Sequence, residues 1–153
     1  MNSHGSWDSA EQAVVDLFVA ELPEVAGGLI ELRALARTAG LRTKVAVASR
    51  DAKQNAVKTF VGVDEVHMRR LSQLLPGEIV DVVPWRDDFA QRVRMAVAPA
   101  NIARMELDEG QQVAQVELAD NDSSRRLMDD YAHRQLVNRF VAGRVELSIA
   151  ASA

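Results

Sequence analysis

The stretch FVGVDEVHMRRL, residues 60–71, holds the residue types best suited to binding an anion. A glycine just before a helical pattern lets backbone approach a ligand, and a helix N-terminus offers free N–H groups and partial positive charge to a phosphate. Arg69 and Arg70 follow on the helix and can add phosphate contacts. Two carboxylates, Asp64 and Glu65, stand where the anion would lie. The stretch therefore indicates either an altered phosphate site or a helix start capped by acids.

Other reactive side chains form no catalytic or metal-binding motif. His4, His67 and His133 are scattered along the sequence, and the chain has no cysteine. The pair Asp87 and Asp88 stands at an expected helix start, where the helix dipole accounts for it. No serine, histidine and aspartate fall into a nucleophile motif. We therefore expect no enzymatic activity, no metal and no cofactor.

Composition and charge indicate a globular protein that does not attract nucleic acid over its whole surface. The 153 residues are 48% hydrophobic and 26% charged, which suits one ordinary domain or two small ones. The formal net charge is −4, with 18 basic and 22 acidic residues, so any contact with nucleic acid must be local. No apolar run approaches the roughly 20 residues of a membrane span, and the N-terminus does not resemble a signal peptide. A cytoplasmic location is expected, with no membrane partner.

The elements that must position these residues follow from apolar spacing and from the glycines and prolines. In the first half, the pattern predicts a helix over 9–22 with Ser9 as N-cap, paired strands over 29–37 and 41–49, a helix over 54–61, a helix over 65–75 and a strand over 78–85. In the second half it predicts a helix over 87–98, strands over 101–108 and 112–120, a helical stretch over 123–141 broken near 129–132, and a strand over 144–150. The same order of helices and strands is therefore predicted in both halves of the sequence.

The repeated order predicts an α+β fold of two copies of one small module. We expect an N-terminal tail over residues 1–9, a first module over 10–85 and a second over 86–153. Each module should have a three-stranded sheet with helices on one face. With a glycine loop between two of its helices, this is the order of the prokaryotic-type (type II) KH domain, whose G-x-x-G loop clamps about four nucleotides.

A longer match makes the resemblance more specific. The segment ALARTAGLRTKVAVAS, with Arg37, Gly40, Arg42, Thr43 and Lys44, resembles the tandem KH region of the bacterial transcription elongation and termination factor NusA. The segments LFVAELPEV, PGEIVDVVPW and DDFAQRVRMAVAPANI stand in the matching order and spacing. The likeness is close in the first module and weaker in the second. It implies the RNA-binding core of that family, without the polymerase-binding and S1-type domains.

The resemblance also implies which residues would bind RNA. It places the first G-x-x-G loop at Gly62, Val63, Asp64 and Glu65, where only the first glycine remains. The expected contacts are the Gly62 N–H and the basic side chains of Arg69, Arg70, Arg42 and Lys44, with bases lying on the sheet edge. The alternative is that Asp64 or Glu65 only caps the next helix.

The second loop is more strongly altered. The resemblance places it at Asp129, Asp130, Tyr131 and Ala132, where both glycines and the usual lysine are absent. Side chains at the former glycines block close approach of the backbone to a phosphate. We expect a degenerate loop that caps a helix and binds no ligand.

Two functions remain open at this point. The first is binding of single-stranded RNA in transcription elongation, termination or antitermination, as the resemblance implies. The second is a protein-interaction module that keeps the KH fold, has lost RNA binding and contacts a transcription or ribosomal protein. The acidic loops favour the second, and the family expectation favours the first.

Overall fold

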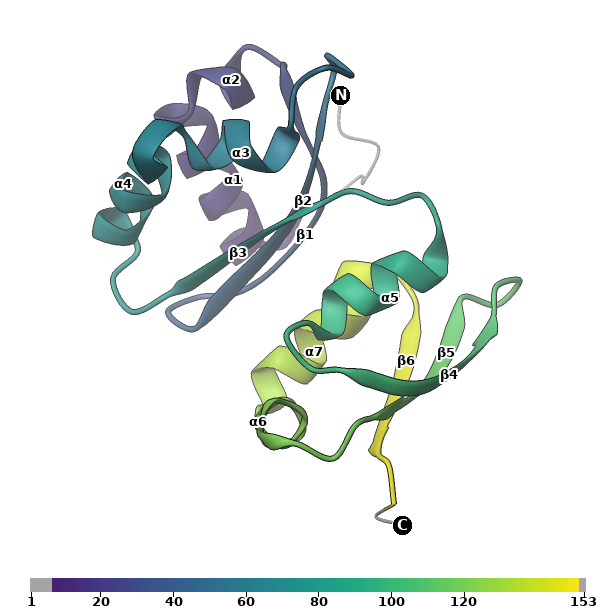
Figure 1. Ribbon diagram of the computed structural model, residues 1–153. Coiled ribbons are helices and arrows are strands. Elements are labelled where there is room, and N and C mark those ends of the chain that lie inside the picture. Colours follow the sequence, from purple (N-terminus) through teal and green to yellow (C-terminus); the bar gives the residue numbers. More distant parts are fainter. Residues whose placement is uncertain (1–6, 152–153) are drawn as a thin grey trace. The chain divides into compact units, whose positions relative to one another are not determined.

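The computed structural model describes residues 7–151, so most of the expected N-terminal tail lies outside the described residues. The chain divides between Trp85 and Arg86 into two compact units (Figure 1). Each unit contains one three-stranded sheet, and the strand orders are β1-β2-β3 and β4-β5-β6. The expected α+β fold of two tandem modules is confirmed.

The first unit begins with helices and continues with a hairpin. Its elements are α1 (Ser9–Glu21), α2 (Pro23–Ala26), β1 (Ile30–Thr38), β2 (Arg42–Ser49), α3 (Ala56–Val61), the short 3-10 helix η1 (Val63–Glu65), α4 (Val66–Leu74) and β3 (Ile79–Pro84). β1 and β2 are antiparallel, whereas β2 and β3 are parallel. The parallel pairing requires the chain to cross over, and α3 and α4 form that crossover.

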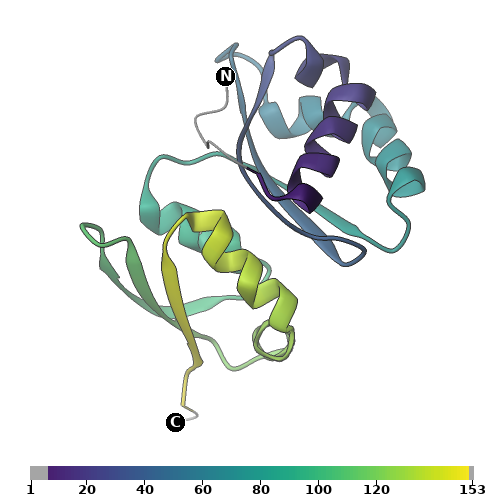
Figure 2. The ribbon, with the colours of Figure 1, turned by 180° about the vertical axis from the view of Figure 1, so that it is seen from behind.

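The helices of the first unit cover one face of its sheet (Figures 1 and 2). Their shared core contains Val14 and Phe18 of α1, Leu22 directly after α1, Leu35, Val45 and Val47 of the sheet, Phe60 of α3 and Leu71 of α4. The rings of Phe18 and Phe60 meet edge to face, with centroids 5.1 Å apart. This packing fixes α1 against α3, so the connection between α3 and α4 starts from a rigid helix.

The helix caps differ in part from the expectation. Ser9 was expected to cap α1, but Asp8 does so, accepting the Glu11 N–H at 2.7 Å, while the Glu11 carboxylate accepts the Asp8 N–H at 3.0 Å. The reciprocal pair forms a capping box, which satisfies two N–H groups at once. Pro23 ends α1 as expected and also begins α2.

The second unit repeats the order with one helix fewer at its start. Its elements are α5 (Phe89–Val97), β4 (Ile102–Asp108), β5 (Val113–Leu118), α6 (Asp122–Asp129), α7 (Tyr131–Val141) and β6 (Arg144–Ile149). β4 and β5 are antiparallel and β5 and β6 are parallel, as in the first unit. Val93, Val116, Leu136 and Phe140 belong to its buried interior. α6 and α7 therefore correspond to α3 and α4 of the first unit.

Candidate nucleic-acid interface

Gly62 ends α3 in a conformation that other residues rarely adopt, with φ +86°. A Cβ atom at this position would lie 2.9 Å from both His67 Nδ1 and Val66 Cγ1. The backbone angle and the lack of space both exclude a side chain here. The first glycine of the expected loop is therefore a structural requirement of the turn between α3 and α4.

The Gly62 N–H is not available in the way the sequence suggested. It donates to the carbonyl oxygen of Lys58 at 2.9 Å and so closes the last turn of α3. The Glu65 N–H in turn donates to the Gly62 carbonyl at 3.0 Å, within the single turn of η1. The expected contact between the Gly62 N–H and a phosphate is thus wrong in this conformation, because the amide already has a partner.

Asp64 and Glu65 both adopt the left-handed backbone conformation, with φ +52° and +58°. Neither side chain caps α4: Glu65 occupies the N-cap position without a side-chain hydrogen bond, and none is found for η1. The expectation that one of these carboxylates caps the helix is therefore wrong. Both acids are exposed to solvent.

Glu65 holds the position where the family has the last glycine of G-x-x-G. Its left-handed conformation is one that glycine adopts freely and a residue with a Cβ atom adopts at a cost. The loop has thus lost the glycine but kept a glycine-like backbone. The Val66 N–H donates to the Val63 carbonyl oxygen, and no side chain caps the remaining N–H groups in the first turn of α4.

The two arginines of α4 hold the loop and the helix in place. The Arg69 guanidinium donates to the Asp64 carbonyl oxygen and fixes the loop to the helix that follows. Arg70 Nε lies 3.0 Å from Glu21 Oε1 and joins α4 to α1. Both side chains remain largely exposed, that of Arg70 at 54%, so each can also contact a ligand. Surface ion pairs of this kind are weak enough to exchange partners.

The other two expected basic contacts lie on β2, away from the loop. Lys44 is only 1% exposed, and burial lowers its pKa to about 8, although the Asp81 carboxylate raises it and Arg42 lowers it further. Arg42 itself forms an ion pair with Asp81 on β3. A phosphate cannot reach a buried ammonium without rearrangement, so Lys44 is not part of the interface that we propose below.

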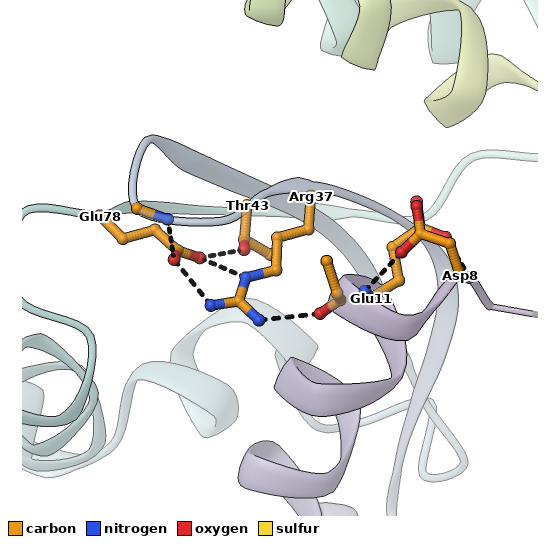
Figure 3. Close-up of polar contacts among 7 residues, drawn as sticks. Asp8, Glu11, Arg37, Thr43 and Glu78 are labelled. Atoms are coloured by element: carbon orange, nitrogen blue, oxygen red, sulfur yellow. Dashed lines mark hydrogen bonds and ion pairs between the residues drawn. The ribbon is translucent and has the colours of Figure 1, made fainter.

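The block that carried the resemblance forms a polar cluster around one carboxylate (Figure 3). Arg37 donates from Nε and Nη2 to the two carboxylate oxygens of Glu78 at 3.0 and 2.9 Å. Thr43 Oγ1 and the Gly40 N–H donate to the same carboxylate at 2.5 and 3.0 Å. Arg37 Nη1 also donates to the Ala10 carbonyl oxygen at 2.8 Å. The cluster ties α1 and the β1-β2 hairpin to the start of β3.

This cluster accounts for the local chemistry of Glu78. Burial alone would raise the pKa of the carboxyl, whose side chain is 2% exposed, but the hydrogen bonds from Arg37, Thr43 and Gly40 hold it below its usual value. A fully bonded carboxylate is stable at this position. Arg37, Gly40 and Thr43 of the segment ALARTAGLRTKVAVAS therefore have a structural role in the first module.

The second loop has a different conformation from the first. α6 ends at Asp129, and Asp130 caps α7 by accepting the His133 N–H at 3.0 Å. The expected helix cap is thus present, at Asp130. No residue from Asp129 to Ala132 has a positive φ, so the loop lacks the glycine-like backbone seen at Asp64 and Glu65.

Three residues of the first module have contacts or positions that were not expected from the sequence. His67 Nδ1 lies 3.1 Å from the Phe60 carbonyl oxygen, and its Nε2 lies 3.9 Å from Glu24 Oε1. The His67 ring of α4 therefore contacts both α3 and α2. Lys58 is an exposed cation one helical turn before Gly62. Glu78 accepts the hydrogen bonds of Arg37, Gly40 and Thr43. Helical spacing alone could have indicated Lys58 as a candidate contact, one turn before Gly62. The roles of His67 and Glu78 depend on tertiary contacts.

Within residues 7–151, no group of three or more histidine or acidic side chains is arranged to hold a metal ion. Over the same range, no helix combines the length and the apolar character needed to cross a membrane.

Fold and loop geometry together define the class as a tandem KH protein whose first module keeps the bent loop backbone. Residues 8–85 match the family described as "NusA-like first KH domain". The chain belongs to this family of KH domains. The resemblance inferred from the sequence is confirmed.

Similar proteins agree with this assignment. The chain is 32% identical over 132 residues to the "Transcription termination/antitermination protein NusA" of Mycobacterium bovis and to that of Mycobacterium tuberculosis. The match covers 86% of this chain and spans 38% of the length of each relative. The solved structure described as "Crystal structure of APE1850" has the same fold, with a TM-score of 0.57 at 14% identity over 91% of this chain and 98% of that one.

Proposed function

We propose that the first module binds single-stranded RNA and acts, in the cytoplasm, in transcription elongation, termination or antitermination, without enzymatic activity. The observation that carries this proposal is the left-handed backbone at Glu65, a conformation that glycine adopts freely, at the position of the last glycine of G-x-x-G. The family and the two mycobacterial relatives support the process.

The chemistry proposed for this interface combines backbone and arginine contacts. The Val66 N–H donates to the Val63 carbonyl oxygen, but no side chain caps the other N–H groups in the first turn of α4, and these can bind a phosphate at the helix N-terminus. Arg69 and Arg70 would add phosphate contacts from the same helix, and Lys58 would add one from α3. Asp64 and Glu65 oppose these contacts, but both are exposed, so solvent and salt screen them. We therefore expect moderate affinity with strong salt dependence.

The test is the affinity for a fluorescent single-stranded oligoribonucleotide, measured by anisotropy at several salt concentrations. Phosphate contacts release counterions, so the logarithm of the affinity must fall steeply with the logarithm of salt concentration. Changing Arg69→Ala with Arg70→Ala should weaken binding for all RNA sequences and reduce the slope by about 1.4, because each phosphate contact on a single strand contributes about 0.7.

A matched control is the pair Arg104→Ala and Arg144→Ala on the sheet of the second unit. These arginines are also exposed and also form surface ion pairs, with Glu106 and Glu146. The control should leave both the affinity and the slope unchanged. Equal effects from the two double variants would show that charge alone, and no specific loop, causes the binding.

A second candidate is a protein-interaction module that keeps the fold and does not bind RNA. It is favoured by two exposed apolar side chains beside the acids, Val63 at 83% and Val66 at 48%. Such a surface suits a transcription or ribosomal protein more than a phosphate chain. An RNA affinity that is undetectable at low salt would favour this candidate over the first.

A further inference from the structure

Tyr131, the single tyrosine of the chain, lies at the first position of α7 with 67% of its surface exposed. The guanidinium carbon of Arg134 lies over its ring, 5.7 Å from the ring centroid. Arg134 Nε is buried and makes no hydrogen bond to any described residue. The guanidinium thus packs against one face of the tyrosine ring. Much of the remaining ring surface is exposed to solvent.

The two aspartates that precede Tyr131 in the sequence are not equivalent. Asp130 is committed to the cap of α7 through the His133 N–H. Asp129 is exposed and makes no hydrogen bond or ion pair with the residues in 7–151. A free carboxylate repels phosphate, but it accepts hydrogen bonds from the amino groups at the edge of a base. The loop therefore disfavours a nucleic-acid backbone and is compatible with a base.

We propose that the second loop binds one unpaired RNA base, which stacks on Tyr131 and donates from its amino group to Asp129. This inference rests on the proposed function, since it takes the same ligand class. A neutral base brings no charge toward the acids, and stacking needs no left-handed backbone. Stacking on an exposed aromatic ring is tolerant of base identity, and the carboxylate adds a preference for bases with an amino group, such as cytosine over uracil. The second loop, which cannot clamp a phosphate, thus contributes to RNA binding by stacking on a base.

The single tyrosine allows a direct test by fluorine NMR. Protein labelled with 3-fluorotyrosine should give one resonance, which reports on Tyr131 alone. A short single-stranded oligoribocytidylate should move this resonance, because a stacked base changes the field at the ring. The same oligonucleotide with abasic positions keeps all its phosphates and should leave the resonance in place.

Variants at the same position give the effect on affinity. Tyr131→Ala should weaken binding of the oligoribocytidylate by about 5- to 150-fold and leave the salt slope unchanged, since stacking releases few counterions. Tyr131→Phe keeps the ring and should bind within about twofold of the unaltered protein. Gln135→Ala, on an exposed position of the same helix, is the control and should bind equally well. Circular dichroism of each variant checks the fold.

The outcomes separate this inference from the proposed function. If anisotropy shows salt-dependent RNA binding that Arg69→Ala with Arg70→Ala weakens, but the fluorine resonance does not move, the stacking site is refuted and the function of the first loop stands. If the resonance moves and those arginine changes have no effect, the first loop is refuted and the stacking site stands. No binding by either method refutes both.

Discussion

At the scale of single residues, the first loop shows that a backbone conformation can outlast the residue type that usually provides it. The sequence indicated the place of the loop correctly, because a glycine before a helical pattern is a specific signal. It did not indicate the left-handed conformation of Asp64 and Glu65. Carboxylates at a helix start usually act as caps, and only the observed angles exclude that role here.

The first prediction concerns Glu65→Gly. A residue with a Cβ atom in the left-handed conformation costs about 1–2 kcal/mol, and glycine removes this cost while adding about 0.5–1 kcal/mol of backbone entropy to the unfolded state. The free energy of unfolding in urea should therefore rise by roughly 0.5–1 kcal/mol. RNA affinity should rise as well, because a negative charge is removed. The loss of stability that a capping role would cause is not expected.

Val63→Gly is the matched control for this change. Val63 lies in the same loop, but its φ is not positive, so glycine only adds freedom to the unfolded chain. We expect a small loss of stability there. A loss at Glu65 as large as that at Val63 would mean that the left-handed conformation carries no strain.

The second prediction concerns Glu78 and acid. Its pKa is held below the usual value in the folded state, so the stability that it contributes is present above the unfolded value of about 4.3 and is lost as the pH falls through the folded value. Glu78→Gln should lower the free energy of unfolding by about 1.5–3 kcal/mol at neutral pH, since bonds to a charged group are lost. The variant should then lose less stability than the unaltered protein on acidification below about pH 4.3.

The exposed Glu31, paired with Arg33 on the surface, is the control for the effect of charge alone. Glu31→Gln should change the free energy of unfolding by less than about 0.5 kcal/mol at every pH. Urea unfolding curves across the acidic range measure both variants. If Glu78→Gln loses as much stability on acidification as the unaltered protein, other carboxylates cause the acid dependence of stability.

At the scale of elements, the two helix–loop–helix connections diverge although they occupy the same place in their modules. α3 and α4 are joined by Gly62 and a turn with two left-handed residues, whereas α6 and α7 are separated by one capping residue. The break near 129–132 could be predicted because the acidic pair interrupts the helical pattern. A consequence is that the second connection is held by one side-chain cap.

The third prediction follows from that cap. Asp130→Ala removes the acceptor of the His133 N–H and should lower the free energy of unfolding by about 0.5–2 kcal/mol. Asp129→Ala, one residue earlier and without a partner within the described residues, should change it by less than about 0.5 kcal/mol. Urea titration compares the two. Equal effects would show that the charge of the loop, and not the cap, stabilises α7.

The order and type of the elements were largely predictable, whereas several roles of side chains were not. Apolar spacing, with the glycines and prolines, predicted the strands and the longer helices, whereas the short helices α2 and η1 were not predicted. Lys44 was mistaken for a surface contact because a lysine beside valines in a strand does not show which face is covered. Glu78 was missed because its partners lie 35 to 41 residues away in the sequence. Local patterns contain no information on such contacts.

At the scale of the whole molecule, the chain has two units with separate cores and a net charge of −4. Binding of RNA by an acidic protein requires that the basic side chains be concentrated in one place. Lys58 precedes one loop of the first unit, Arg69 and Arg70 follow it in the sequence, and all three are exposed. The second unit offers an aromatic ring in place of such a group.

The fourth prediction is that residues 1–85, produced alone, fold and keep the salt dependence of RNA binding. The family match ends at the same residue as the first compact unit, and the core of this unit lies within it. The fragment should unfold cooperatively, and the slope of log affinity against log salt should match that of the whole chain, because the phosphate contacts lie in this unit. A folded fragment with a much smaller slope would place those contacts in the second unit.

The left-handed backbone at Glu65 also has a genetic consequence. Glutamate and glycine codons differ only at the second base, so a single nucleotide change there supplies the glycine that the family has, with no rearrangement of the loop. In the second module, glycine codons at Asp129 and Ala132 are equally close, but the cap at Asp130 would still hold the helix start in its present form. One point mutation therefore gives the first loop both glycines of the G-x-x-G pattern. The second loop needs two such mutations and would still have the Asp130 cap.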